Sequence, residues 1–125
     1  MLAAAILLAV PLVVARTLEP NPAGLGTHQQ LGFPPCTVRA IWAIRCPACG
    51  MTTSWSHFVR GQLAMSLRAN VAGTLLALFA CTAIVVLARA ALCGAVPQIG
   101  WLVAVAWGMI LMLAVALAQW AWRLV

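Results

Sequence analysis

Two long runs of uncharged, apolar residues constrain this chain more than any other feature. The first extends over 71–92 and contains no charged residue before Arg89, and the second extends over 100–122 and contains none. A helix rises about 1.5 Å per residue and needs about 20 apolar residues to cross a hydrocarbon core of ~30 Å. Both runs reach that length. We therefore predict two transmembrane helices, separated by a turn over 93–97.

Small residues recur at four-residue spacing in both predicted helices. Gly73, Ala77 and Cys81 form such a series in the first helix, and Ala104 and Gly108 form one in the second. Small side chains allow two helix backbones to approach closely within a membrane. The spacing therefore predicts that these two faces pack against each other.

The N-terminal apolar segment is shorter. Residues 1–15 carry no charged side chain and are followed by Arg16. Fifteen helical residues cover only about 22 Å, but an extension to Leu18, with the Arg16 side chain reaching the headgroups, makes a span nearly long enough. A cleaved signal peptide is the alternative, and the absence of Lys and Arg before Arg16 argues against it. We expect a first transmembrane helix over 1–18, bent or thinned at Pro11.

Composition supports an all-α integral membrane protein with a single domain over 1–125. Hydrophobic residues make up 66% of the chain and charged residues 6%, whereas soluble domains are about 45–50% apolar. The one acidic residue, Glu19, excludes mechanisms that need two carboxylates, such as glycoside hydrolysis. The seven basic residues are all arginines spread singly along the chain. This spacing is typical of membrane flanks and argues against nucleic-acid binding.

The connection over 19–70 is the polar part of the chain. Met51, Trp55, Phe58 and Val59 recur at spacings of three and four, which predicts a short amphipathic helix with Ser56 on its opposite face. A second short helix is expected between Leu63 and Asn70, and both helices are expected to lie on the membrane surface or against the bundle.

The orientation follows from the arginines. Five of them lie between residues 16 and 70, and cytoplasmic loops are enriched in Arg and Lys. We therefore expect this connection on the cytoplasmic side of a bacterial cytoplasmic membrane. The absence of Lys beside abundant Ala and Leu is typical of a GC-rich bacterial source.

The reactive side chains of the connection are concentrated in Cys46-Pro47-Ala48-Cys49-Gly50, with Cys36 ten residues before. Pro favours the first position of a helix, so Pro47 predicts that a helix begins here and that Cys46 lies at its N-cap. The helix dipole and Arg45 would then lower the pKa of Cys46. On this basis Cys46 is expected to be the more reactive thiol.

The stretch resembles domain-of-unknown-function family 2752, a family of small bacterial membrane proteins. The resemblance rests on Cys36, on the CPxCG motif extended to Thr52, and on Gly61, Leu63, Ala64 and Asn70 ahead of a spanning helix. It departs from the family at Gln62, where an acidic residue is expected, and at Val71, where Pro often stands. The resemblance implies a multi-helix membrane protein with cysteines at the membrane edge, and it implies no activity.

Three interpretations of the cysteines follow. Nothing in the sequence demands catalysis, so the favoured one is a scaffold or partner-binding protein, associated with the bilayer and with another membrane protein. The second is a thiol–disulfide redox protein that uses Cys46 and Cys49, with Cys36 as a resolving thiol. Its layout, though not its sequence, resembles that of membrane oxidoreductases of the vitamin K epoxide reductase type, which implies a quinone as the oxidant. Whether the protein is an enzyme stays open between these two.

The third interpretation is a metal site. Tetrahedral zinc requires four ligands, of which Cys36, Cys46 and Cys49 supply three. His57 or His28 is expected to supply the fourth. The remaining cysteines, Cys81 and Cys93, fall in or beside the first long apolar run and are expected to pack as small residues.

Overall fold

The chain folds into helices only, with no strand among residues 1–94 and 98–124, which the computed structural model describes. This confirms the all-α class. The elements, in chain order, are α1 (Leu2–Thr17), the 3-10 helix η1 (Thr27–Leu31), α2 (Thr37–Trp42), α3 (Met51–Phe58), α4 (Leu63–Ala69), α5 (Val71–Cys93) and α6 (Ile99–Leu124).

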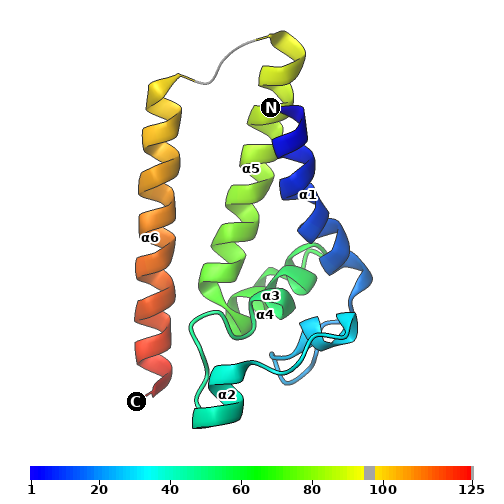
Figure 1. The fold of residues 1–125 in the computed structure, drawn as a ribbon, viewed down its shortest axis with the longest axis vertical. Helices are drawn as coiled ribbons and strands as arrows, with labels where there is room; N and C mark the ends of the chain where they lie inside the picture. Colours follow the sequence, from blue (N-terminus) through cyan, green and yellow to red (C-terminus); the bar gives the residue numbers. More distant parts are fainter. Residues whose placement is uncertain (95–97, 125) are drawn as a thin grey trace.

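Two helices, α5 with 23 residues and α6 with 26, are long and apolar enough to cross a membrane. They run side by side along the long axis of the molecule (Figure 1). In its most apolar stretch of 18 residues, α6 has no residue that is buried within the protein. These side chains therefore need an apolar environment outside the chain. Gly94 ends α5 in a left-handed conformation with φ 65°, and residues 95–97 of the predicted turn lie outside the described part of the chain.

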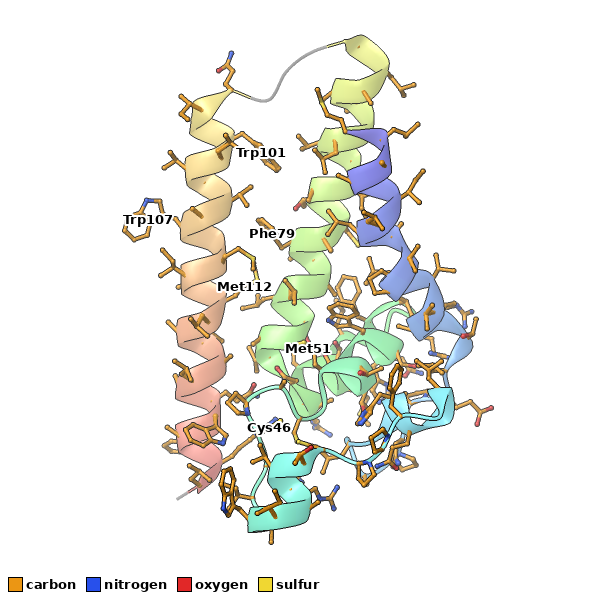
Figure 2. All side chains as sticks on the ribbon, in the orientation of Figure 1. Cys46, Met51, Phe79, Trp101, Trp107 and Met112 are labelled. Carbon is orange, nitrogen blue, oxygen red and sulfur yellow. The ribbon has the colours of Figure 1, made fainter. Side chains whose placement is uncertain are left out.

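The predicted pairing of small-residue faces between the two long helices is wrong. Gly73 packs on α3, where a Cβ would meet the Ser54 side chain at 3.1 Å. Gly108 on α6 faces the ring of Phe79, and a Cβ added at Gly108 would lie 3.3 Å from that ring. Figure 2 shows Phe79 directed toward α6 and Trp107 directed away from the bundle. The small residues of α5 instead accommodate α1 and α3, because Leu12 of α1 packs against Ala77 and Ala80.

The first helix, α1, is 16 residues long and contains Pro11. It packs along α5 and contacts α3 near its C-terminal end (Figure 1). Its buried residues, Ala5, Leu12 and Ala15, lie on one face. Its apolar length is below that of α5 and α6, so a third membrane span remains a prediction.

The short helices α3 and α4 lie across the N-terminal end of α5 and form a platform there (Figure 1). The predicted apolar face of α3 packs, partly buried, against the core between α1 and α5. The most buried residues of α3 are nevertheless polar: Ser56 is fully buried and donates to the Leu18 carbonyl at 2.6 Å. Ser54 donates to the Asn70 carbonyl at 3.0 Å, and its hydroxyl lies 3.0 Å from that of Ser66. A hydroxyl is small and finds partners on neighbouring backbones, so these helices approach more closely than larger side chains would allow.

Two arginines secure the ends of helices at this platform. Arg60 donates to the carbonyls of Ala15 and Arg16 at 3.3 and 2.9 Å, at the C-terminal end of α1. Arg123 of α6 donates to the carbonyls of Arg68 and Ala69 at 3.2 and 2.9 Å, at the end of α4. A cation at a helix C-terminus satisfies carbonyls that lack a partner in the helix. The arginines therefore join the platform to α1 and to α6.

Candidate three-cysteine site

Cys36 reaches the CPxCG motif because the chain reverses direction between them. Cys36 precedes α2, and α2 ends at Ala43, whose φ of 56° places it in the left-handed region. The Ala43 N–H closes the helix on the Arg39 carbonyl at 3.1 Å. The chain then returns to Cys46. As a result the sulfurs of Cys36, Cys46 and Cys49 all lie within 4.8 Å of one another.

The CPxCG segment forms turns rather than the first turn of a helix, so the prediction that Pro47 begins a helix is wrong. The Cys49 N–H donates to the Cys46 carbonyl at 3.0 Å, and α3 begins only at Met51. Its N-cap is Gly50, with φ 87°. This left-handed residue redirects the chain between the turns and the helix. Cys46 therefore lies outside the helix. Figure 2 shows both Cys46 and Met51 at the platform end of the bundle.

Within the turn the two thiols are in contact. The Cys46 Sγ lies 3.2 Å from the Cys49 Sγ, and the Cys46 N–H donates to the same sulfur at 3.3 Å. Cys49 is buried, while Cys36 and Cys46 are partly exposed. All three are free thiols. The turn therefore presents two sulfurs on one side, with Cys36 facing them from the other segment.

The turn is attached to the beginning of α5. The Asn70 Nδ2 donates to the carbonyls of Pro47 and Cys49 at 3.1 and 3.2 Å. Its Oδ1 accepts from the Gly73 N–H at 2.8 Å and so caps α5. Sequence reasoning did not assign Asn70 this role, although an Asn directly before an apolar run is an N-cap signal.

Gly50 is the second attachment. A Cβ at this position would lie 2.7 Å from both the Ala69 and the Gly24 carbonyl oxygens. Only a residue without a side chain allows three segments of backbone to meet there. The glycine of the CPxCG motif thus has a packing role as well as a conformational one.

The two partly exposed thiols differ in acidity. The pKa of Cys36 is lowered, because its sulfur accepts hydrogen bonds from the backbone N–H of Arg39 and from the Cys46 thiol. Burial, together with hydrogen bonds to Cys49 and Cys36, raises the pKa of Cys46 to about 12. This reverses the expectation that Cys46 is the more reactive thiol, because Cys36, and not Cys46, precedes a helix.

A pocket of about 260 Å³ opens beside the sulfurs. Besides the three cysteines, His28 and Gln29 of η1 and Arg39 of α2 line it. The 3-10 helix is held in place by Thr27, whose hydroxyl lies 2.8 Å from that of Thr53 in α3. His28 therefore lies on the same pocket as the sulfurs.

The structure does not bring His57 into the group of three sulfurs. Its Nδ1 lies 2.6 Å from the Gln62 Oε1, and the residue lines a different pocket. Cys81 packs beside the apolar cluster of α1 and α5, and Cys93 is exposed at the end of α5. Both lie outside the group.

Comparison with known proteins gives one match. Residues 36–84 match the model of the family described as "Protein of unknown function (DUF2752)", which confirms the resemblance. The matched segment contains the three cysteines of the site, α2, α3, α4 and residues 71–84 of α5, while α1, η1 and α6 lie outside it. No curated protein and no solved structure matches the chain.

Proposed function

We propose that this chain, which belongs to the DUF2752 family over residues 36–84, is a multi-pass membrane protein with a metal site. Cys36, Cys46 and Cys49 bind the ion, and zinc is the metal that their chemistry favours. The observation that carries the proposal is the convergence of three sulfurs from two segments within 4.8 Å.

The distances support a metal better than a disulfide. Zn–S bonds of ~2.3 Å in a tetrahedron place two sulfurs about 3.8 Å apart. The Cys46 and Cys49 sulfurs lie 3.2 Å apart, and every pair in the group lies within 4.8 Å. A disulfide requires about 2.05 Å, and only one pair could form it. A single ion uses all three sulfurs after shifts of a few tenths of an ångström to about 1 Å.

A fourth ligand would come from the pocket beside the sulfurs. His28 and Gln29 line that pocket with the cysteines, whereas His57 does not. A neutral imidazole is a common zinc ligand, and a water is the usual alternative in a site with three protein ligands. His28 lines the pocket but is not among the three residues whose ligand atoms all lie within 4.8 Å of one another. We therefore assign the fourth position to a water molecule, or to His28 after its side chain turns toward the sulfurs.

The role of such a site is structural. Only three apolar side chains between residues 18 and 49 are buried, namely Leu18, Leu25 and Cys49. A segment with so little apolar burial gains stability from a metal cross-link. The ion would fix the connection on the platform of α3 and α4, which makes the protein a membrane scaffold.

The membrane arrangement completes the proposal. α1, α5 and α6 cross the bilayer, and the cysteines lie at its cytoplasmic edge. Support comes from the arginines: Arg89 lies toward the far end of α5, while the others lie at the ends of α1, α3, α4 and α6 near the platform or in the segment 39–45. Positively charged residues accumulate on the cytoplasmic side.

One observation favours a second candidate, thiol–disulfide exchange. The contact between the Cys46 and Cys49 sulfurs at 3.2 Å is compatible with a disulfide after a small rotation. Oxidation of the two thiols would release two protons and two electrons to an acceptor such as a quinone. Cys36 would then be the third thiol that attacks the disulfide.

Metal analysis of the purified full-length protein in detergent separates the two candidates. The metal site predicts about one zinc per chain and three thiols that become reactive with a maleimide only after chelation. The redox candidate predicts no bound metal and a Cys46–Cys49 disulfide that cycles with a quinone. Zinc-free protein with this disulfide would overturn the metal proposal.

A further inference from the structure

A second pocket lies on the same platform, away from the three cysteines. It has a volume of about 230 Å³ and is lined by the loop 21–24, by Arg45, by His57 of α3 and by Arg68 of α4. No residue lines both this pocket and the pocket of the three cysteines. This pocket is therefore a second candidate binding site, separate from that of the three cysteines.

The pocket is cationic and lacks a neutralising group. The only acidic side chain of the chain, Glu19, does not line it. In the part of the chain that the structure describes, neither the Arg45 nor the Arg68 side chain is hydrogen-bonded to a protein group. The C-terminal carbonyls of α4 are already satisfied by Arg123, so Arg68 is not needed there. Two guanidinium groups are thus available to a ligand.

The backbone holds these residues in place. The Trp120 Nε1 of α6 donates to the Arg45 carbonyl at 2.6 Å, which fixes Arg45 relative to the long helices. The Arg123 guanidinium, bonded to the carbonyls of Arg68 and Ala69, adds a third positive charge beside the pocket. His57 presents a ring whose Nδ1 is engaged with Gln62, so that Nε2 is its remaining polar atom.

The position of the pocket indicates the class of ligand. α4 ends at Ala69 and α5 begins at Val71, so Arg68 lies about one helical turn from the first residue of a long apolar helix. In a bilayer this depth corresponds to the headgroup layer. Arginine binds phosphate oxygens through paired N–H groups. No carboxylate lines the pocket, so the positive charges of Arg45 and Arg68 are free to pair with a phosphate.

We infer that the pocket formed by Arg45, His57, Arg68 and the loop 21–24 binds a phosphate group. The source is the headgroup of an anionic phospholipid in the same leaflet, or a soluble phosphate ester. Arg45 and Arg68 contact the phosphate oxygens. The inference is independent of the proposed metal site, because it depends on no cysteine.

The test uses the full-length protein purified in detergent, with native mass spectrometry to measure bound lipid. The probes are dioleoylphosphatidylglycerol, dioleoylphosphatidylcholine and, separately, glycerol 3-phosphate and inorganic phosphate. We expect the double variant Arg45→Gln/Arg68→Gln to bind phosphatidylglycerol at least about tenfold more weakly than the unmodified protein, since each arginine contributes a charge-assisted contact. The matched control, Arg16→Gln/Arg89→Gln, removes the same charge away from the pocket and is expected to change the affinity by less than about twofold.

The outcomes separate the two sources. Preferential binding of phosphatidylglycerol that the soluble phosphates do not displace supports the lipid. Displacement by glycerol 3-phosphate or inorganic phosphate, lost in the same double variant, supports a soluble ester. Equal weakening in both double variants, or none in either, overturns the inference. Should the glutamine variant fail to fold, Arg45→Lys/Arg68→Lys keeps the charge, and a loss of several-fold is expected because Lys lacks the paired donors.

Discussion

The side-chain nitrogen of Asn70, Nδ2, lies 3.2 Å from the carbonyl oxygen of Cys49. The residue directly before a long apolar helix therefore holds the turn that carries two cysteines. The same side chain caps that helix through the Gly73 N–H. One buried amide therefore couples the position of the sulfurs to the start of α5.

Replacement of Asn70 by Ala should destabilise the protein by about 2–3 kcal/mol, because it removes the cap and two buried hydrogen bonds. Asn70→Asp retains the acceptor that caps α5 but places a carboxylate oxygen against two carbonyls. We expect both variants to lose zinc as well as stability, measured by thermal unfolding in detergent and metal content. An Asp variant with unchanged zinc affinity would mean that Asn70 serves only as a cap.

Gly50→Ala should be more damaging than any other glycine-to-alanine change on the platform. Its Cβ would lie 2.7 Å from two carbonyl oxygens, and its φ is +87°. Overlap and left-handed strain together should cost about 2–4 kcal/mol. Gly61→Ala is the matched control, since φ is +75° there but nothing lies within 4 Å of the Cβ. It should cost only about 1–2 kcal/mol. Equal melting temperatures for the two variants would contradict the close approach at Gly50.

Zinc binding should depend on Cys36, Cys46 and Cys49 together. Each single Ser substitution is expected to lower the zinc content from about one per chain to less than about one tenth, because two thiolates and a neutral ligand bind zinc far more weakly. Cys81→Ser, which lies on α5 outside the group, should retain the metal.

His28→Ala should weaken binding if the imidazole occupies the fourth position, whereas His57→Ala should not. Retention of zinc in Cys36→Ser would restrict the site to the CPxCG turn.

The membrane orientation can be tested with the native cysteines. Cys36 lies at the platform end, and Cys93 is exposed at the opposite end of α5. In spheroplasts, a single-cysteine variant that retains Cys93 should react with a membrane-impermeant maleimide. One that retains Cys36 should react only after permeabilisation, because the arginine-rich end is expected to be cytoplasmic. The reverse pattern would place the three cysteines outside.

Several features of the site were not predictable from the sequence. The CPxCG motif indicated paired sulfurs, and Cys36 was identified as a third member. Nevertheless, the helix predicted to begin at Pro47 begins at Met51. Gly50 fits only because Gly24 and Ala69, distant in sequence, meet there. His57, a predicted ligand, lies on another pocket, and His28 lies on the pocket of the sulfurs.

The helical class, the two long apolar helices and the segment that carries the cysteines were all predictable from the order of residues. Those properties depend on local composition, because the length of an apolar run decides whether a helix can bury its backbone in a membrane. Which sulfurs and histidines share a pocket, and which polar residues of α3 are buried, depends on the packing of the helices. Ser54 and Ser56 are buried because the carbonyls of Asn70 and Leu18 approach them. Contacts between segments far apart in the chain, rather than periodicity within one helix, set those choices.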